Sequence, residues 1–435
     1  MKKMAVVLLS ISLIFGSFQF SYGAGPEPQI IGDAAVLIDG ATGQVLFDKQ
    51  MNKQKFPAST TKIMTSLLAV ENLDMTQKVI IDSTTPFSDG TRIFLVEGEE
   101  VTVDQLLNAM LVESANDAAV AVGKEISGTI PEFTNLMNQR AKELGAKNTN
   151  FDNPNGLPDS MHLTTAYDLA MITKEALKHP EIRKAISTYR YVFSATNKQP
   201  ERYLYNKNKL LFDTDTKVNY NGTIRTLKYD GATGVKTGFT TDAGYCLITS
   251  AKRDGMELIA VVLQSDSTNI FLDSIKLLDY GFANYKSVKV AAKDTPVSQV
   301  KVRGGLFDSV NTVIGEDVYA TLPIDASPDI LNTEVGIETS VNAPVHLGQK
   351  IGSITVFEAN NKLGEFKIVA NEDVPGSAWL TITNILNYIK YLVLAIALIF
   401  LGFIISWVMI KRNKIKRKKL QKHVSHNIRS KEKKI

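Results

Sequence analysis

Apolar and polar residues follow first a strand pattern and then a helix pattern along the start of the chain. Apolar runs at residues 34–39 and 43–47, with Asp39-Gly40-Ala41-Thr42 between them, predict an opening β-hairpin. Apolar residues three or four positions apart then predict helices at 59–73, over most of 103–145 and at 165–177. Pro131 is placed as a first-turn proline and Thr165 as an N-cap, so each marks a helix start.

The strand pattern returns in the middle of the chain. Residues 245–251 and 258–264 are strand-like, with Arg253-Asp254-Gly255 as the turn between them, and residues 271–285 are typical of a closing helix. This order of elements predicts an α+β domain over residues 30–285. We expect an antiparallel sheet flanked by helices, with a helical lobe beside it.

A second domain is predicted from residue 286 to residue 375. Its short alternating runs, such as 300–302, 318–322 and 351–356, are broken by Gly, Pro and Asn. Such a pattern is typical of all-β domains, so we expect a small sandwich here.

The amino-terminal residues 1–24 predict a secretory signal peptide. Lys2 and Lys3 give a positive start, and the apolar run at residues 5–15 is short for a membrane span of about 20 residues. Small residues follow at Ser21, Gly23 and Ala24, where cleavage is expected. An uncleaved anchor helix is the alternative.

The other end of the chain predicts a transmembrane helix over residues 388–410. Residues 391–410 are twenty positions without a charge, with Tyr391 and Trp407 near the edges, where aromatic rings prefer the interface. The basic residues 411–435 follow, and by the positive-inside rule they form a cytoplasmic tail. The expected product is a single-pass protein of the cell membrane, with its folded domains on the extracytoplasmic side.

The net charge is unevenly distributed. Residues 411–435 hold twelve Lys or Arg and one Glu, a charge of +11 in a chain of +4, so residues 1–410 carry −7. The basic character therefore belongs to a tail that faces anionic lipid head groups. It gives no support for nucleic-acid binding, and no nucleic-acid partner is expected.

The scarce cysteine and histidine residues argue against metal chemistry. None of the five histidines stands at His-x-x-x-His or His-x-His spacing, so a zinc peptidase is not indicated, and we expect neither a metal nor a cofactor. Cys246 is the only cysteine and lies in an apolar run, which predicts a buried, inert thiol. Counting leaves a Ser-His-Asp triad open, but the chain has no Gly-x-Ser-x-Gly elbow.

Three short motifs stand in one order along the chain: Ser59-Thr60-Thr61-Lys62, Ser114-Ala115-Asn116 and Lys236-Thr237-Gly238. The first two patterns recur elsewhere, so the ordered set carries the weight. Each also has an ordinary structural explanation, as a helix cap, a helix–helix turn or a strand start. Together the three are the signature of serine enzymes that penicillin acylates.

The first motif fits an activated nucleophile. A serine hydroxyl needs an adjacent base, and Lys62 stands about one helical turn from Ser59 on the same face. The apolar run after Lys62 would bury its amine, and burial together with a second cation favours the neutral form that a base requires. We therefore predict Ser59 as nucleophile and Lys62 as general base.

The other two motifs supply the remaining parts of a cleft. Ser114, in a loop between two helical patterns, would relay a proton to the leaving group, and Asn116 would hold the substrate's amide. Lys236 would supply positive potential and Thr237 a hydroxyl for the substrate's carboxylate, at the start of a strand. Gly238 would let the substrate approach the backbone. The backbone N–H groups of Ser59 and Phe239 would form the oxyanion hole.

These motifs and their surroundings resemble the low-molecular-mass penicillin-binding proteins, the serine-type D-alanyl-D-alanine carboxypeptidases. The resemblance covers roughly residues 34–370 and includes Pro57–Thr65, Asn153–Leu157, Gly234–Thr240 and Ala343-Pro344-Val345. It implies a β-lactamase/transpeptidase-like catalytic domain that removes the terminal D-Ala from peptidoglycan stem pentapeptides through a Ser59 acyl-enzyme. It also implies acylation by β-lactam antibiotics, and a β domain that holds the catalytic domain above the membrane.

Three features depart from the family pattern. Some members bind the terminal carboxylate with an arginine upstream of Lys-Thr-Gly, and here Lys207 in Asn206–Leu210 is the stand-in. The loop over residues 212–229 is longer than usual. Many members also end in a membrane-surface helix, whereas this chain predicts a full span.

Three alternatives stay open on the sequence alone. A class A β-lactamase shares the motifs but adds a deacylating Glu-x-x-Leu-Asn, and the nearest match, at Glu132, has the wrong spacing. A wall DD-endopeptidase or transpeptidase would use the same cleft residues. A non-catalytic penicillin-binding sensor would keep the fold without the turnover.

Overall fold

The computed structural model describes residues 26–432. The predicted signal peptide therefore lies outside the described residues. The chain divides into two compact units, which we describe separately. The first extends to Ala292 and includes residues 317–334 and 354–366; the second holds the remainder. The predicted domain boundary at 285/286 stays a prediction.

The first unit is built on a five-stranded antiparallel sheet in the order β2-β1-β11-β10-β9. Its strands are β1 Ala34–Asp39, β2 Val45–Lys49, β9 Ala232–Thr240, β10 Gly244–Arg253 and β11 Met256–Ser265. The opening hairpin and the β10–β11 pair confirm the predicted strands. β9 is an edge strand of this sheet.

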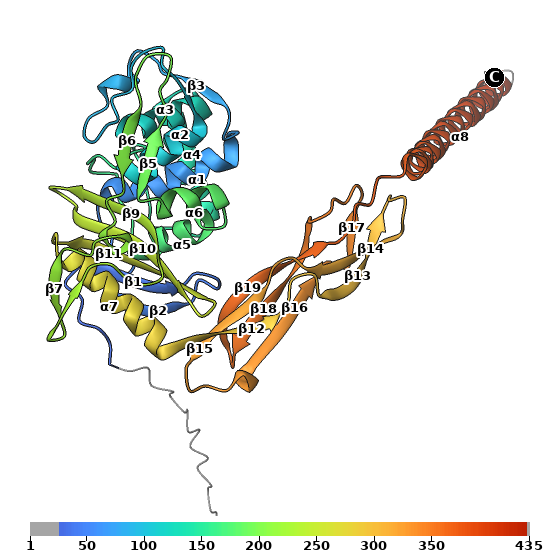
Figure 1. Cartoon of the computed structure of the whole chain (residues 1–435). Coiled ribbons are helices and arrows are strands. Elements are labelled where there is room, and N and C mark those ends of the chain that lie inside the picture. Colours follow the sequence, from blue (N-terminus) through green and yellow to red (C-terminus); the bar gives the residue numbers. More distant parts are fainter. Residues whose placement is uncertain (1–25, 433–435) are drawn as a thin grey trace, which may run out of the picture. The chain divides into compact units, whose positions relative to one another are not determined.

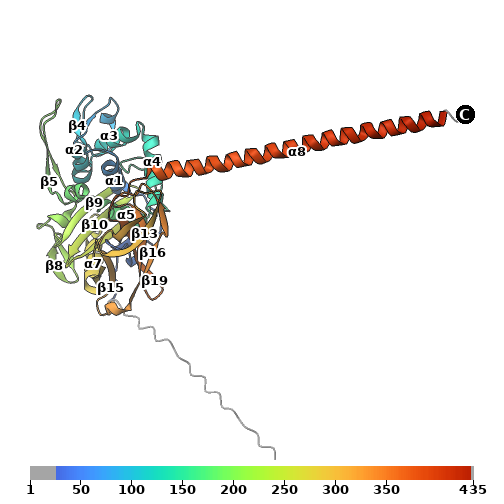
Figure 2. The ribbon, with the colours of Figure 1, turned by 90° about the vertical axis from the view of Figure 1, so that its right-hand side faces the viewer.

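Within residues 26–284, the first unit has seven α-helices. They are α1 Lys62–Asn72, α2 Val103–Asn108, α3 Asn116–Ser127, α4 Ile130–Glu143, α5 Ala166–Ala176, α6 Pro180–Ser187 and α7 Asn269–Asn284. The helices α2, α3 and α4 pack on one another and on α1, as the predicted helical lobe. Figures 1 and 2 show α7 on one face of the sheet and α1 and α5 on the other. Successive side chains of β1 point to opposite faces of the sheet. Val36 and Ile38 join the core with α1 and α5, whereas Leu37 joins the core with α7.

Short elements complete residues 26–284 of this unit. The single turns are η1 Ala58–Thr61, η2 Thr85–Phe87, η4 Lys209–Leu211 and the π-helical turn η3 Ala109–Glu113. The two-stranded ribbons are β3 Lys78–Ile80 with β4 Glu100–Thr102, β5 Arg190–Phe193 with β6 Arg202–Tyr205, and β7 Lys217–Tyr220 with β8 Thr223–Thr226. The β7–β8 ribbon lies within the segment 212–229 that the sequence analysis marked as long.

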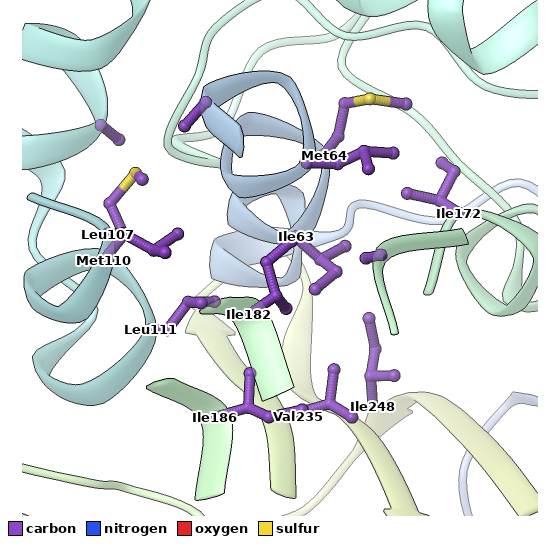
Figure 3. Packing of buried hydrophobic residues seen from close by; sticks show 14 of the residues in the cluster. Ile63, Met64, Leu107, Met110, Leu111, Ile172, Ile182, Ile186, Val235 and Ile248 are labelled. Carbon is purple, nitrogen blue, oxygen red and sulfur yellow. The ribbon is translucent and has the colours of Figure 1, made fainter. Parts of the chain in front are cut away.

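The apolar face of α1 holds the centre of the larger core. Ile63, Met64 and Leu67 are fully buried, and Figure 3 shows the first two among side chains from α2, η3, α5, α6 and the sheet. The helix predicted from Ser59 begins at Lys62, because Ser59 lies in the preceding 3-10 turn. This packing anchors the turn that carries Ser59.

The carboxyl-terminal region is rich in strands, as predicted. A six-stranded sheet has the order β16-β18-β19-β14-β13-β17, and β12 pairs with β15. The bounds are β12 Tyr285–Ala291, β13 Pro296–Arg303, β14 Ser309–Ile314, β15 Val318–Pro323, η5 Pro328–Ile330, β16 Leu331–Ile337, β17 Ser340–Asn342, β18 Lys350–Glu358 and β19 Asn361–Ala370.

The last element is the helix α8, Ala378–Glu432. Its segment Tyr388–Arg417 is long and apolar enough to cross a membrane. This segment contains the predicted span, and the helix continues through much of the predicted basic tail.

Candidate active site

Ser59 lies in η1, immediately before α1. The turn is held by Thr60, whose hydroxyl donates to the Pro57 carbonyl at 2.7 Å, and Ala58 adopts a positive φ of 48°. A non-glycine residue in this conformation costs about 1–3 kcal/mol and persists only where its surroundings impose it. The strained turn presents the Ser59 hydroxyl to a cleft of about 450 Å³.

The Lys62 amine is in contact with the Ser59 hydroxyl. Its Nζ lies 2.9 Å from Ser59 Oγ, 2.6 Å from Asn116 Oδ1 and 2.7 Å from the Asn155 carbonyl oxygen. The side chain is fully buried. Burial lowers the Lys62 pKa well below its ordinary value and the Lys236 charge lowers it further, while the Asp117 carboxylate opposes both. A hydroxyl beside a buried amine of lowered pKa is an arrangement that activates nucleophiles.

Ser114 occupies the predicted junction between two helices. It ends η3 in the left-handed region, with φ 71°, and the Ala115 N–H donates to the Ala109 carbonyl at 3.0 Å. This sharp turn lets Ser114 line the cleft that Ser59 also lines. A π-helical turn is frequent at functional sites, and the sequence carried no signal for it.

Asn116 begins α3, and its carboxamide already has partners. Its Oδ1 accepts from Lys62, and its Nδ2 donates to the Asp89 carbonyl at 2.6 Å. The oxygen keeps a second lone pair for a substrate amide. Asn116 therefore orients the Lys62 amine in addition to the role predicted for it. The next residue, Asp117, is buried and accepts from the Leu95 N–H at 3.0 Å.

The Lys-Thr-Gly motif lies in the middle of β9, which begins at Ala232, so the prediction that Lys236 starts a strand was wrong. Lys236 is buried, and its Nζ donates to the Thr237 carbonyl at 2.8 Å. Burial lowers the Lys236 pKa to about 7, with a further contribution from the Lys207 charge, while Glu113 opposes them. Thr237 lines the cleft.

Gly238 allows β9 to pack closely against the turn that carries Ser59. A Cβ at this position would lie 3.0 Å from the Ser59 nitrogen and 3.1 Å from the Pro57 oxygen. The glycine therefore lets β9 approach the turn that carries Ser59. Phe239 follows in the cleft wall, half exposed, with its ring 4.4 Å from the Tyr245 ring.

Lys207 lines the same cleft and forms an ion pair that the sequence did not predict. Its Nζ lies 2.7 Å from the Glu113 carboxylate, which also accepts from the Tyr205 N–H at 3.0 Å. The two partners are 94 positions apart, so no local pattern marks Glu113. The site thus gathers four lysines: Lys62 and Lys236 are buried, and Lys207 and Lys209 line the cleft.

The structure also bears on the predictions for Cys246 and Glu132. Cys246 is buried and burial raises the pKa of its thiol to about 11, which is what an inert thiol requires. Glu132, the nearest match to a β-lactamase deacylating residue, is exposed in the first turn of α4. The lining residues of the cleft do not include it.

His162 is hydrogen-bonded to the turn that carries Ser59. Its Nδ1 accepts from the Asp152 N–H at 2.9 Å, so the ring proton lies on Nε2 and is donated to the Thr61 hydroxyl at 2.8 Å. The neutral ring fits this pair of contacts, and burial lowers the His162 pKa from 6.5 to about 4.

We expect the fold to lose stability in acid through His162. Because its folded-state pKa of about 4 lies below 6.5, the unfolded chain takes up the proton first. Its contribution is therefore complete above pH 6.5 and falls by about 2 kcal/mol by pH 5. Urea unfolding followed by circular dichroism at pH 7 and pH 5 measures this, with His162→Gln as the comparison. The same loss in both proteins would contradict the assignment.

The structure therefore brings residues of all three motifs together, in an arrangement that suits serine acyl transfer. A comparison with family models agrees with this class. The model described as D-alanyl-D-alanine carboxypeptidase matches residues 23–267, and the model described as penicillin-binding protein 5, C-terminal domain, matches residues 285–376.

Individual relatives extend over most of the chain. D-alanyl-D-alanine carboxypeptidase DacF of Bacillus subtilis is 36% identical over 355 residues, which are 80% of this chain and 87% of the relative. The structure of penicillin binding protein 5 from Haemophilus influenzae is 30% identical, with a TM-score of 0.60, and the match covers 81% of this chain and 100% of that one. This chain belongs to the D-alanyl-D-alanine carboxypeptidase family of serine peptidases, as its motifs predicted.

Two matches from Streptomyces K15 cover less of this chain. A D-alanyl-D-alanine carboxypeptidase of Streptomyces sp. strain K15 is 32% identical over 272 residues, 59% of this chain and 89% of the relative. A solved structure described as a mutant of the Streptomyces K15 DD-transpeptidase matches at 29% identity and a TM-score of 0.53, covering 59% of this chain and 100% of that one.

Proposed function

We propose that Ser59 removes the terminal D-Ala from peptidoglycan stem pentapeptides through an acyl-enzyme. Ser59 Oγ bonds to the carbonyl carbon of the penultimate D-Ala while its proton passes to Lys62. The C–N bond then breaks, the nitrogen takes a proton by way of Ser114, and free D-Ala leaves. Water hydrolyses the ester and restores the serine.

The contact between Lys62 Nζ and Ser59 Oγ carries this proposal. A neutral amine can donate two hydrogen bonds and accept one. Of the three partners of Lys62, only Ser59 has a proton to give, because the Asn116 Oδ1 and the Asn155 carbonyl can only accept. The neutral form therefore aims its lone pair at the serine proton. Its lowered pKa favours that form.

The substrate's carboxylate and its reacting carbonyl need separate partners. Thr237 and Lys207 bring a hydroxyl and a positive charge to the wall of the cleft, and the buried Lys236 lies next to Thr237. The N–H groups of Ser59 and Phe239 would receive the oxyanion, where one donor is worth about 10²–10³ in rate. A β-lactam, whose ring amide and carboxylate resemble those of the peptide, would acylate Ser59 in the same way.

The apolar helix α8 is a candidate membrane anchor of this cell-wall enzyme. We propose a single span, with the basic end in the cytoplasm and the catalytic unit on the extracytoplasmic side. The support is the asymmetry of charge, because the lysines and arginines follow the span at 411–435.

The proposal is tested with the purified full chain and a diacetyl-Lys-D-Ala-D-Ala peptide. We expect release of D-Ala, its loss after stoichiometric benzylpenicillin, and a mass adduct on Ser59. An adduct without D-Ala release would favour a sensor or a crosslink-cutting enzyme. Rapid hydrolysis of the penicillin would indicate a β-lactamase.

Transpeptidation is the second candidate, because the Streptomyces K15 relative is described as a DD-transpeptidase. Both reactions share the acyl-enzyme and differ in what attacks it. Adding an amino-acid acceptor to the peptide assay separates them. A pure hydrolase forms only the shortened peptide, whereas a transpeptidase also forms the peptide joined to the added amino acid.

We expect Lys207→Ala to weaken recognition of the terminal carboxylate. The Lys207 amine lies in the cleft wall and forms an ion pair with Glu113. It can bind the substrate's carboxylate in place of Glu113. A hydrogen bond to a charged group contributes about 1.5–3 kcal/mol, so kcat/KM should fall roughly 10-fold or more. Kinetics with the acid and the C-terminal amide peptide measure this.

The amide peptide lacks the carboxylate, so it should lose little from the substitution. Lys217→Ala, an exposed lysine of β7, is the control for a general change of charge. An equal fall with both peptides would mean that Lys207 does not read the carboxylate.

A further inference from the structure

Three exposed apolar side chains gather in the connections at one end of the six-stranded sheet. They are Leu306 and Phe307, between β13 and β14, and Leu347, between β17 and β18, and they are 64%, 59% and 64% exposed. We call these three residues the tip cluster. Single exposed apolar residues are ordinary, but a group of this kind at one end of a domain marks an interaction surface.

The connections that carry the tip cluster are fixed to one segment, residues 373–377. The Leu306 N–H donates to the Pro375 carbonyl at 2.8 Å, and the Leu347 N–H donates to the Asp373 carboxylate at 2.9 Å. Val345 and Val374 exchange both backbone hydrogen bonds, and both side chains are buried. The exposed side chains therefore stand on a well-packed base.

The same segment leads directly into α8. Ser377, whose N–H donates to the Gly304 carbonyl at 2.8 Å, precedes the first helical residue, Ala378. The apolar span begins at Tyr388. The helical residues between these points extend about 15 Å at roughly 1.5 Å per residue. An anchored chain thus holds the base of the tip cluster within about 15 Å of the start of the apolar segment.

We propose that the tip cluster inserts into the membrane interface as a second, shallow anchor of the β region, by which we mean the strand-rich residues 293–376. This inference rests on the proposed membrane anchoring by α8 and is independent of the serine chemistry. Charged residues of both signs lie close to the cluster in the chain, Arg303, Asp308 and Lys350, and Asp373 accepts from the Leu347 N–H. Attraction to anionic lipid is therefore not what selects the membrane. The apolar side chains would insert by about 5–10 Å, also into an uncharged bilayer.

The insertion would fix the β region at two points. A helix alone leaves the domain free to swing about the connection at residue 377. The tip cluster would restrict that motion of the strand-rich region at the membrane surface.

The test uses the full chain in phosphatidylcholine vesicles, with an environment-sensitive fluorophore at Phe307→Cys or Leu347→Cys and lipids brominated on their acyl chains. Wild type supplies the blank, because its only cysteine, Cys246, is buried. Phe403→Cys, in the span, and Val335→Cys, exposed on the edge strand β16, are the two controls. Circular dichroism shows that each variant folds.

We expect quenching at the two tip positions to lie between strong quenching at residue 403 and none at residue 335. The substitution Leu306→Asp places a charge beside the fluorophore at residue 307 and should reduce its quenching. Quenching at residue 403 with none at the tip would overturn the proposal while leaving the span intact. An apolar environment that persists in detergent and grows with protein concentration would also overturn it, in favour of a second copy of the chain.

Discussion

Lys62→Met should abolish acylation of Ser59 by penicillin and release of D-Ala from the peptide. Methionine keeps the length and apolar stem of lysine but has no amine to take the serine proton. Positioned acid–base groups contribute about 10²–10⁴ in rate, and we expect a loss near the upper end because Lys62 also fixes the serine rotamer. The rate constant for acylation by benzylpenicillin, followed by mass spectrometry, measures this directly.

The control for this substitution is Lys78→Met. Lys78 is an exposed lysine of β3 that pairs with Glu100, so its loss removes a charge without touching the cleft. In Lys62→Met the Asn155 carbonyl and the Asn116 Oδ1 lose a donor, at about 1–3 kcal/mol each. Circular dichroism must therefore show a folded protein first. Wild-type acylation in a folded Lys62→Met would exclude Lys62 as the base.

Much of the fold was predictable because apolar periodicity and turn residues are local signals. The strands β1, β10 and β11 and the helix α7 lie close to where alternation and helical spacing placed them. Thr165 also caps α5 as predicted, accepting from the Asp168 N–H at 3.1 Å. These features depend on residues within a few positions of each other.

The geometry of the site was predictable only in part. The three motifs indicated the residue types, but the contacts that place them come from backbone atoms and distant chain segments. The Asn155 carbonyl, which holds Lys62, is an acceptor that every residue type possesses, so the sequence cannot mark it. Glu113 and Lys207 meet across 94 positions. Gly238 was correctly singled out for close approach, but the neighbour is the Ser59 turn.

Gly156 provides a test of close backbone packing against the turn that carries Ser59. It lies in the loop 153–157, where the Asn153 side chain accepts from the Gly156 N–H at 2.7 Å and the Asn155 carbonyl holds Lys62. The loop packs against the turn that carries Ser59. A Cβ on Gly156 would lie 1.8 Å from the Ala58 oxygen and 2.9 Å from the Ser59 nitrogen. Both are backbone atoms, which cannot move aside as a flexible side chain can.

We therefore expect Gly156→Ala to displace the serine turn or the lysine-holding loop. A misplacement of about 1 Å costs on the order of 10²-fold in rate, so acylation by benzylpenicillin should fall by at least that much. The φ of Gly156 is +90°, which adds about 1–3 kcal/mol of backbone strain for alanine. Acylation kinetics and urea unfolding of the same preparation measure the two effects separately.

Gly145→Ala is the matched control, because it separates strain from steric contact. Gly145 follows α4 with a φ of +81°, and a Cβ there would meet nothing within 4 Å. It should lose stability through the same backbone strain and keep the wild-type rate of acylation. If Gly156→Ala also kept that rate, the loop would not position the serine turn. If both variants lost the rate equally, the effect would belong to general destabilisation, since the strain is the only feature that the two positions share.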